Sequence, residues 1–478
     1  MRSLTILQLN DLHGYLTPHP ELFRLAPNDR FRSGGGVARI AAIFQSIRRE
    51  VDGALIALDN GDTFHGTMPA VCTEGEALLG PMSALGLDGM TAHWEFAYGF
   101  ERLKAIADRL PYPLLAANCE DDTGASPFPP FRIIERGGVK VGVIGLAAVI
   151  ASHLLPVADR DRVRLTLGDA ELRTHIPFLK REHRVDVIVV LSHLGFPQDC
   201  KLAAVVPGID VLLSGHTHHR LEQPAVVNGT LIIQSGAHGS FVGRLDLEVS
   251  PAGIVGWRHA LLPVDDATAP DAEMAHIVDH AVGAFAGAGA HVVGTTRTAL
   301  DRYAMLESTM DNLLLDAIAT DADRPIALSN GWRYGAPIPP GPLTELDLWN
   351  IVPTNPPVSV AAITGEEFRR LFEENLEATF ACDPWQQRGG YLKRCRGIQL
   401  AVKLENPKGH RIQEFRVDGD RLRLDAVYPV AFLGEQAVPA DYGRDRRSLG
   451  MHAVDALRQH LHRHDSVSAD LRGAVVMV

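Results

Sequence analysis

Aspartates and histidines recur in this chain directly after short apolar segments of the kind that form buried strands. The residues placed in this way are Asp11, His13, Asp59, Asp62, His193, His216 and His218, while His93 and Glu95 lie together in residues 91–99. Carboxylates neutralise the charge of a divalent cation, and imidazoles supply borderline-soft nitrogen ligands. The pattern predicts a centre of two metal ions that share one aspartate, an arrangement that can hold an attacking hydroxide and clamp an anionic ester.

Each motif taken alone has a simpler explanation. An Asp-x-His sequence such as residues 11–13 is common in surface loops, and His193 after an apolar strand fits a hydrogen-bonded core histidine. The carboxyl ends of strands in an α/β sheet, however, border one crevice. The recurrence of these residue types at consecutive strand ends therefore favours a metal centre.

The segments that must position these residues alternate between two kinds over the first 260 residues. Short apolar runs predict strands, and stretches with apolar residues at helical spacing predict helices. The predicted strands are 4–9, 54–58, 139–146, 185–191, 211–213 and 231–233, and the predicted helices are 37–49, 100–110 and 170–184. This alternation is typical of a layered α/β domain.

The character of the chain changes near residue 262. A predicted helix from 272 to about 285 leads into an Ala/Gly-rich stretch at 286–290. Beyond it we expect helices at 309–320 and 365–378 and strands at 397–402, 411–417 and 427–432. The sequence therefore predicts a first domain at 1–265, a helical linker at 266–290 and a second domain at 291–478.

The composition excludes several classes of protein. The 478 residues contain 46 Lys and Arg against 58 Asp and Glu, a net charge of −12, which disfavours general binding to nucleic acids or membranes. The five cysteines have no C-x-x-C spacing, which indicates reduced thiols. We see no export signal and no apolar run of 18 residues, and so expect a cytoplasmic protein.

The blocks that carry the polar residues resemble the calcineurin-like metallophosphoesterases, and within them the 5′-nucleotidase/2′,3′-cyclic phosphodiesterase family. The specific blocks are residues 10–14, 60–62, 91–99, 191–193 and 215–218, and looser ones are 234–239, 307–312, 329–333 and 363–365. The resemblance implies an α/β fold with a four-layer α/β/β/α sandwich, followed by a smaller α+β 5′-nucleotidase-like domain that selects the substrate. It also implies hydrolysis of phosphate esters, with a nucleotide or another small anionic ester as substrate.

The resemblance assigns the metal ligands by position. One ion would bind Asp11, His13, Asp62 and His218, and the other would bind Asp62, His93, His193 and His216. We expect two divalent ions. Mn²⁺ is the first expectation and Zn²⁺, Co²⁺ or Fe²⁺ are alternatives, because the nitrogen-rich ligand set disfavours Mg²⁺.

The central block departs from the family pattern. The family reads Gly-Asn-His-Glu-Phe-Asp, whereas residues 92–97 read Ala-His-Trp-Glu-Phe-Ala. His93 thus replaces an asparagine ligand, and Trp94 and Ala97 replace a catalytic histidine and its supporting aspartate. An indole can donate a hydrogen bond but cannot deliver a proton. The candidate catalytic residues that remain are His65 and His238, as replacement acids, and Glu95.

A missing general acid has a consequence for the substrate. Such an acid contributes about 10²–10⁴-fold to a rate. Without it the reaction slows most for an alkoxide leaving group and least for a thiolate, since the pKa of a thiol is only about 8.5. We therefore expect an activated leaving group unless another residue supplies the proton.

Two alternatives remain beside the phosphoesterase. The His-Trp-Glu-Phe block, residues 386–390 and Arg394 resemble the SoxB-type thiosulfohydrolases, which use two manganese ions to release sulfate from a cysteine S-thiosulfonate on a sulfur-carrier protein. Those enzymes are exported, whereas this chain shows no export signal. The third reading is a metal-bound pseudoenzyme that serves as a ligand-binding scaffold, against which the retained ligands weigh.

The second domain offers candidate substrate-binding residues. Arg333 and Arg394 can contact an anion in bidentate fashion. The aromatic residues that can stack on a base are Trp332, Tyr334, Trp385 and Tyr391, with core packing as the alternative for both tryptophans. The family's Gly-Gly-Asp-Gly-Tyr block is not clear in this sequence, which leaves the choice of a nucleotide open.

Overall fold

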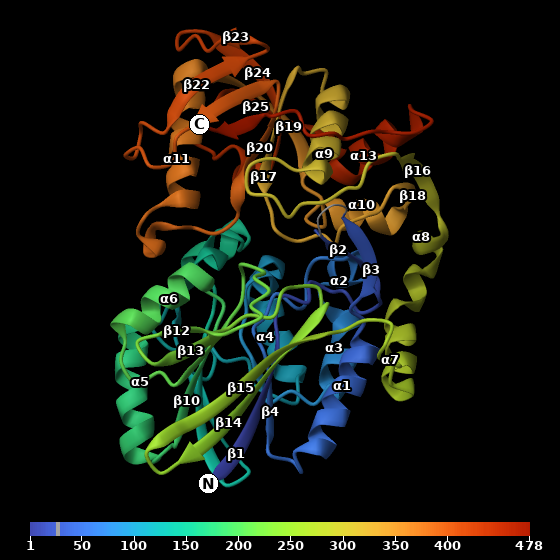
Figure 1. The fold of residues 1–478 in the computed structure, drawn as a ribbon. Helices are drawn as coiled ribbons and strands as arrows, with labels where there is room; N and C mark the ends of the chain where they lie inside the picture. Colours follow the sequence, from blue (N-terminus) through green and yellow to red (C-terminus); the bar gives the residue numbers. More distant parts are fainter. Residues whose placement is uncertain (25–28) are drawn as a thin grey trace. The chain divides into compact units, whose positions relative to one another are not determined.

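The computed structural model describes residues 1–24 and 29–478, which divide into two compact units, Met1–Ala284 and Phe285–Val478 (Figure 1). The division falls within the predicted linker. Helix α7 (Ala272–Val282) buries Met274 and Val278 against α1 (Val37–Glu50) and α3 (Glu76–Ala84). This helix is therefore packed as part of the first unit.

The first unit contains two mixed sheets. The order of the first sheet is β15 (Gly253–Pro263), β14 (Phe241–Ser250), β1 (Arg2–Leu9), β4 (Leu55–Asp59) and β5 (Gly89–Met90). The order of the second is β12 (Ala225–Val227), β13 (Thr230–Ile233), β11 (Val211–Ser214), β10 (Val187–Ser192), β8 (Val139–Leu146) and β7 (Phe131–Arg136). Strands β1, β4 and β5 run parallel, as do β8, β10, β11 and β13.

The two sheets pack face to face between two helical layers (Figure 1). Ile6 and Leu58 of the first sheet belong to the same buried cluster as Val189 and Leu213 of the second. On its other face the first sheet is covered by α1, α3 and α4 (Phe100–Arg109), and the second sheet is flanked by α5 (Asp169–Glu182) and α6 (Phe196–Val205). The predicted α/β/β/α sandwich is confirmed.

Continuous apolar runs marked the central strands well, because both faces of those strands are buried. Strand β8 has the predicted bounds, and β10 is shifted toward the C-terminus. The same criterion misses β14 and β15, since β14 alternates buried and part-exposed residues and every residue of β15 is part-exposed or exposed. Further elements of this unit are β2 (His19–Phe23), β3 (Arg30–Gly34), α2 (Met68–Cys72), β6 (Cys119–Asp121) and β9 (Val163–Leu165).

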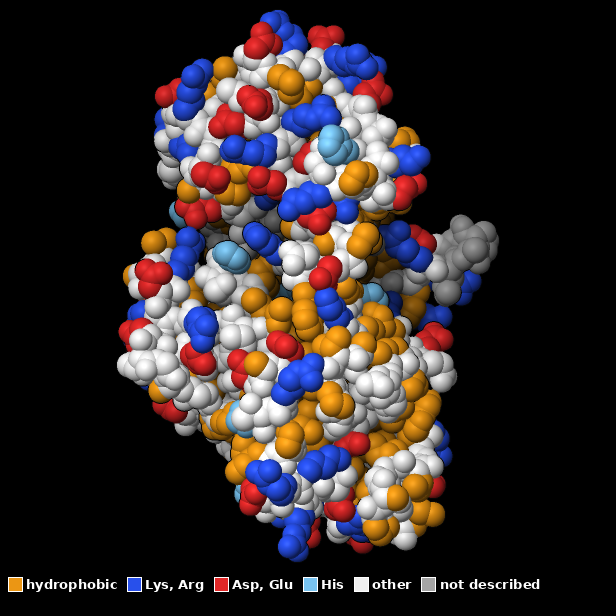
Figure 2. Space-filling view, turned by 90° about the vertical axis from the view of Figure 1, so that its left-hand side faces the viewer, with side chains coloured by type: hydrophobic (Ala, Val, Ile, Leu, Met, Phe, Trp, Pro, Cys, Tyr) orange, Lys and Arg blue, Asp and Glu red, His pale blue; other side chains and the backbone are white. Residues whose placement is uncertain are grey.

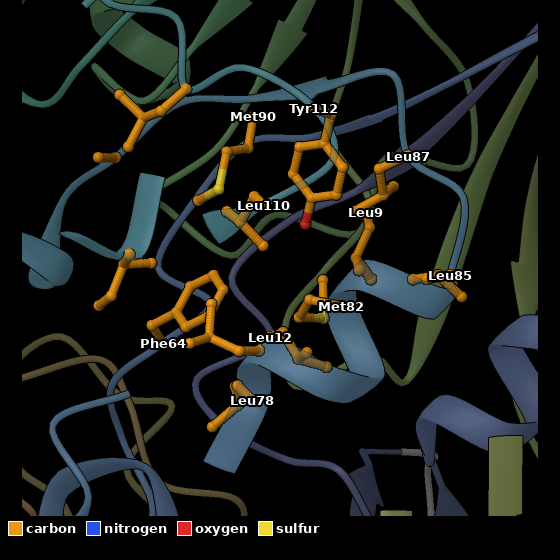
Figure 3. Packing of buried hydrophobic residues seen from close by; sticks show 14 of the residues in the cluster. Leu9, Leu12, Phe64, Leu78, Met82, Leu85, Leu87, Met90, Leu110 and Tyr112 are labelled. Atoms are coloured by element: carbon orange, nitrogen blue, oxygen red, sulfur yellow. The ribbon is translucent and has the colours of Figure 1, made fainter. Parts of the chain in front are cut away.

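The apolar core on the helical side of the first sheet anchors the loops that follow its strands. Figure 3 shows Leu12 and Phe64 among the buried side chains of α3, including Leu78 and Met82. Leu12 lies between Asp11 and His13 in the sequence, so burial of its side chain leaves its two polar neighbours on the other side of the loop. The core thereby orients these polar residues.

The second unit combines a five-stranded sheet with a four-stranded one. The order of the five-stranded sheet is β20 (Tyr391–Arg396), β17 (Ile326–Gly331), β24 (Val427–Leu433), β19 (Pro357–Thr364) and β25 (Arg444–His452). The order of the four-stranded sheet is β23 (Asp420–Arg421), β22 (Ile412–Val417), β21 (Ile398–Val402) and β26 (Val475–Met477). The helices are α8 (Ala286–Ala290), α9 (Thr309–Asp321), α10 (Glu345–Ile351), α11 (Gly365–Phe380), α12 (Gly434–Ala437) and α13 (Ala453–His462), and a ribbon of β16 (Val292–Thr296) and β18 (Gly341–Thr344) completes the unit.

The N-termini of two helices in this unit are capped as their sequences suggest. Thr364 and Glu367 form a reciprocal capping box at α11, and the Ser308 side chain accepts a hydrogen bond from the Asp311 backbone at α9. These caps explain why both helices begin where the sequence predicts. The α+β second domain is confirmed.

On the face drawn in Figure 2, acidic and basic side chains are interspersed and do not gather into a field of one sign. Among the helices of the described residues, none has the length and apolarity that crossing a membrane requires.

Candidate metal centre

The residues predicted as metal ligands all lie in loops at the carboxyl ends of parallel strands. Asp11 and His13 follow β1, Asp62 follows β4 and His93 follows β5. His193 follows β10, and the pair His216 and His218 follows β11. The first sheet therefore contributes both aspartates, and the second sheet contributes three of the histidines.

Within the described part of the chain, these seven side chains form two groups that can each hold a metal ion. The groups are Asp62, His93, His193 and His216, and Asp11, His13, Asp62 and His218, with the ligand atoms of each group within 4.8 Å of one another. Asp62 belongs to both. The two groups coincide with the two ligand sets that the family resemblance implies.

Asp62 is the point on which the donor atoms converge. Its Oδ2 atom lies 2.8 Å from Nδ1 of His93, 3.2 Å from Nε2 of His193 and 3.5 Å from Nε2 of His13. Its Oδ1 atom accepts a hydrogen bond from the backbone N–H of Trp94 at 2.8 Å. One carboxylate oxygen is thus held by the backbone, while the other faces the imidazoles.

Asp11 plays the corresponding part in the second group. Its Oδ1 atom lies 3.2 Å from Nε2 of His218 and 3.5 Å from Nε2 of His193. Its Oδ2 atom accepts hydrogen bonds from the Asn10 side-chain amide at 2.7 Å and from the His216 backbone N–H at 3.0 Å. The Nε2 atoms of His13 and His218 are 3.2 Å apart.

The chemistry of this donor set fits a pair of divalent cations. Burial works against charge at His193, but the carboxylates of Asp62 and Asp11 outweigh it and raise the pKa of this imidazole to about 10. The cluster therefore demands positive charge, which protons or metal ions can supply. Three nitrogens with one oxygen in one group, and two of each in the other, suit Mn²⁺, Fe²⁺, Co²⁺ or Zn²⁺.

The backbone at these positions is strained. Side chains other than glycine rarely adopt a positive φ, and such residues cluster at functional sites. The ligands with positive φ are Asp11 (52°), His13 (48°), Asp62 (56°), His216 (69°) and His218 (57°). Two hydrogen bonds between the loops stabilise this backbone conformation. The Asp11 N–H donates to the Gly61 carbonyl at 3.0 Å, and the His13 N–H donates to the Asp62 carbonyl at 2.7 Å.

Glu95 supports the loops of the centre from behind. One of its oxygens accepts hydrogen bonds from the backbone N–H of Thr63 at 2.7 Å and of Phe64 at 3.2 Å, and the other accepts from the His93 N–H at 2.8 Å. The side chain is fully buried. These bonds tie Glu95 to the backbone of the loops that carry Asp62 and His93, and the catalytic role offered for it from the sequence stays a prediction.

The two candidate proton donors, His65 and His238, are both buried beside the centre. The His65 ring stacks on Trp94, and the His238 ring centroid lies 5.7 Å from that of His13. Burial lowers the pKa of His65 to about 3 and holds the pKa of His238 well below its usual value. Both imidazoles are therefore neutral near pH 7, which weakens the hypothesis that either one replaces the missing acid.

Three of the predicted substrate-binding residues lie together in the second unit. The guanidinium carbons of Arg333 and Arg394 lie 5.3 Å and 5.4 Å from the ring centroid of Tyr391. Arg394 is almost fully buried, and its Nε atom donates to Oδ2 of Asp311 at 2.9 Å. Oδ1 of the same carboxylate accepts from Arg302 at 3.0 Å, so two guanidiniums share one negative charge.

The two predicted tryptophans lie elsewhere in this unit. Trp332 is only 4% exposed, stacks on Tyr334 and donates its indole N–H to Gln436 at 2.9 Å. This is the packing alternative, and the burial removes Trp332 from the residues that can stack on a base. Trp385 is half-buried in the short 3₁₀ helix η5 (Pro384–Gln386).

Sequence reasoning assigned no role to a layer of buried polar side chains beneath the predicted ligands. Its members are Gln8, Asn10, Asn60, Asp199 and Gln234. A signal was present at Gln8, a polar residue inside the apolar run that forms β1. The hydrogen bonds of this layer connect segments far apart in the sequence, and for this reason a local pattern does not reveal them.

Comparisons with known proteins agree with the two-unit architecture. Residues 4–220 match the calcineurin-like phosphoesterase family, and residues 291–434 match the 5′-nucleotidase C-terminal domain. The trifunctional nucleotide phosphoesterase YfkN of Bacillus subtilis is 25% identical over 90% of the chain, which spans 31% of that protein's length. Bovine 5′-nucleotidase is also 25% identical over 90% of the chain and 82% of its own length.

Solved structures share the fold over the whole chain. The sulfate thiohydrolase SoxB of Thermus thermophilus has a TM-score of 0.89 at 24% identity, with coverage of 99% of this chain and 96% of that one. The 5′-nucleotidase precursor of Thermus thermophilus has a TM-score of 0.88 at 24% identity, with coverage of 100% and 99%.

Proposed function

Because the chain joins a calcineurin-like phosphoesterase domain to a 5′-nucleotidase C-terminal domain, families of hydrolases that act on phosphate esters, we propose that it hydrolyses nucleotide-like phosphate esters at the centre built around Asp62. The observation that carries the proposal is that Asp62 lies in both groups of ligand atoms. A bridging carboxylate between two such groups is the arrangement used in two-metal hydrolysis.

The residues of the first unit have distinct tasks in this proposal. One ion would be held by Asp11, His13, Asp62 and His218, and the other by Asp62, His93, His193 and His216. Two bound divalent ions supply positive charge that lowers the pKa of water and stabilises charge on the ester oxygens. Glu95 accepts hydrogen bonds from the backbone N–H groups of Thr63 and His93, and it thereby keeps Asp62 and His93 in place.

The second unit supplies the selectivity for an anionic, nucleotide-like substrate. Tyr391, close to both Arg333 and Arg394, offers an aromatic face next to positive charge. Arg394 Nη1 is buried and has no hydrogen-bond partner among the described residues, so a negatively charged oxygen would satisfy it. This arrangement supports a substrate that carries both a ring and an anionic group.

Trp94 limits which ester can react. Its indole cannot deliver a proton to the leaving group, and Ala97 offers no carboxylate to assist. The neighbouring His65 is held neutral by burial. We therefore propose a preference for leaving groups of low pKa.

The same observation favours a second candidate, release of sulfate from a cysteine S-thiosulfonate on a sulfur-carrier protein. A thiolate-type leaving group needs little help from an acid, because the pKa of a thiol is about 8.5. This candidate would use the same ligands around Asp62, with Mn²⁺ as the expected metal.

Turnover by the metal-stripped protein reconstituted with Mn²⁺ tests both candidates. The substrates are p-nitrophenyl phosphate, bis-p-nitrophenyl phosphate, AMP and S-sulfocysteine. Hydrolysis of the phosphate esters that is lost in Asp62→Asn supports the phosphoesterase, and hydrolysis of S-sulfocysteine alone supports the second candidate. Binding of two metal ions without turnover of any of these compounds contradicts the phosphoesterase and favours a pseudoenzyme or a carrier-bound substrate.

A further inference from the structure

The candidate centre is assembled from two sheets that need a precise mutual register. The aspartates come from loops after β1 and β4, whereas His193 and His216 come from loops after β10 and β11. The sheets meet through apolar side chains such as Leu58 and Leu191. Apolar contacts are non-directional, so they hold the sheets together without fixing the strand ends to the few tenths of an ångström that metal ligation requires.

Asn60 supplies directional bonds at this junction. It follows β4 on the first sheet and is fully buried. Its side-chain Nδ2 donates to the backbone carbonyls of Ser192 at 2.8 Å and Leu213 at 2.7 Å, which lie at the ends of β10 and β11. One amide group therefore ties the first sheet to both strands that carry histidine ligands.

The backbone of Asn60 also orients one ligand. Its carbonyl oxygen lies 2.6 Å from Nδ1 of His193, which places the proton of this imidazole on Nδ1. The other nitrogen, Nε2, is then left to face Oδ2 of Asp62 at 3.2 Å. A hydrogen bond of this kind on the far side of a ligating histidine sets its tautomer and ring orientation.

A neighbouring amide fixes which way the Asn60 side chain points. Gln8 Nε2 donates to Asn60 Oδ1 at 2.8 Å and to the Ser214 carbonyl at 2.8 Å. Gln8 Oε1 in turn accepts from the Ser235 hydroxyl at 2.8 Å. The oxygen of Asn60 is thus committed to Gln8, and its nitrogen is committed to the two strand-end carbonyls.

We infer that Asn60 is a positioning residue whose buried side-chain amide sets the register between the two sheets and so brings the aspartates and histidines of the centre within ligating distance of one another. The inference rests on the proposed metal centre and does not require that the substrate be known. It assigns metal affinity to a side chain that contacts no metal.

Asn60→Asp tests the inference with an almost isosteric change. A carboxyl group offers at most one donor, and only when it is protonated, so the two bonds to Ser192 and Leu213 cannot both persist. The metal-free protein is titrated with Co²⁺. Calorimetry and the visible absorption of bound cobalt both monitor the titration. We expect Co²⁺ affinity to fall by about 10–100-fold, as with other outer-layer partners of metal ligands.

Asn118→Asp is the matched control. Asn118 is also fully buried, and its Nδ2 donates to the carbonyls of Ala147 and Thr166, each at 2.8 Å. Its Oδ1 accepts from the Ala147 N–H at 2.8 Å. The same substitution there should lower the midpoint of thermal unfolding without changing the cobalt affinity or the absorption spectrum.

The inference is overturned if Asn60→Asp binds Co²⁺ as tightly as the unaltered protein, or if Asn118→Asp weakens binding equally. If Asn60→Asp does not fold, Asn60→Ala removes the same bonds without adding charge. Its dissociation constant for Co²⁺ is then compared with that of the unaltered protein. An unaltered protein that binds cobalt but hydrolyses no ester contradicts the proposed function alone, because the affinities still decide this inference. An unaltered protein that binds no cobalt contradicts both.

Discussion

The imidazole of His65 stacks on the indole of Trp94, with ring centroids 4.7 Å apart and an interplanar angle of 20°. Both side chains are more than nine-tenths buried. Trp94 stands where the family resemblance expects the catalytic histidine, and in the proposed function this stacked aromatic pair takes the place of a proton donor. The consequences for catalysis can be measured directly.

The leaving group should govern the rate in this protein. We expect Trp94→His with Ala97→Asp to raise the ratio of the AMP rate to the p-nitrophenyl phosphate rate by about 10–100-fold, because a restored acid mainly helps the poorer leaving group. Steady-state kinetics of the Mn²⁺-loaded protein provide the measurement. Trp94→Phe keeps an aromatic ring without a donor and should leave the ratio unchanged. An unchanged ratio in the double variant would mean that the proton comes from elsewhere.

Removing the shared carboxylate should empty both metal positions. In Asp62→Asn we expect the bound metal to fall well below two ions per chain and kcat/KM for p-nitrophenyl phosphate to fall by about 10³-fold, since the ions supply several kcal/mol of charge stabilisation. Metal analysis after gel filtration, together with the assay, checks this prediction.

Asp59→Asn is the comparison for Asp62→Asn. Asp59 is also buried and lies nearby, but its oxygens accept from the Thr63 hydroxyl at 2.6 Å and from the Gly61 N–H at 3.0 Å. Burial raises its pKa to about 8, so the neutral amide resembles the group already present at pH 7. Equal metal loss in both variants would mean that general disruption, and not loss of the bridge, explains the effect.

Asp199 should make the stability of the metal-free protein depend on pH. Burial raises the pKa of this carboxyl to about 7, although the hydroxyls of Ser192 and Ser214 donate to it. The folded protein therefore keeps a proton that the unfolded chain releases near pH 4, and this site loses stability as the pH rises from about 4 to about 7.

Urea unfolding in EDTA at several pH values measures that effect. Asp199→Asn should gain stability relative to the unaltered protein over this range, by no more than about 4 kcal/mol. The control is Asp186→Asn. A hydrogen bond from Arg2 lowers the pKa of Asp186, so the carboxylate of Asp186 adds stability as the pH rises, and its replacement should lower the stability of the protein. A difference between Asp199→Asn and the unaltered protein that does not change with pH would refute the assignment.

Trp332 and Tyr391 should respond differently to truncation. Trp332 is buried against Tyr334, so Trp332→Ala should lower the free energy of unfolding by about 3–5 kcal/mol. Tyr391 is part-exposed beside Arg333, so Tyr391→Ala should raise KM for AMP with little change in stability. Chemical denaturation and steady-state kinetics on both variants separate the two roles. A raised KM with normal stability in Trp332→Ala would mean that Trp332 contacts the substrate and does not stabilise the fold.

Residue types and their placement after apolar runs predicted a metal centre, and the family resemblance assigned its ligands by position; the structure brings the same seven side chains into two groups. Asp11, Asp62 and His193 each follow a strand that is buried on both faces, and such strands have a strong local signature. Because parallel strands of one sheet end at a common edge, the sequence could also predict that Asp11 and Asp62 lie close together, whereas the approach of His193 depends on how the second sheet packs on the first. The α/β class of the first domain followed from the same alternation of runs, and the second domain followed from the change in character near residue 262.

The roles of residues that depend on distant partners were decided only by the tertiary structure. Arg394 was predicted to contact an anion, and only the structure shows that its Nε atom also pairs with Asp311, 83 positions away. Glu95 was offered as a catalytic group, and only the structure shows that its side chain accepts hydrogen bonds from backbone N–H groups of a loop about 30 residues earlier. Burial and hydrogen-bond partners arise when segments far apart in the chain pack together, whereas strand propensity and ligand chemistry reside in the local sequence.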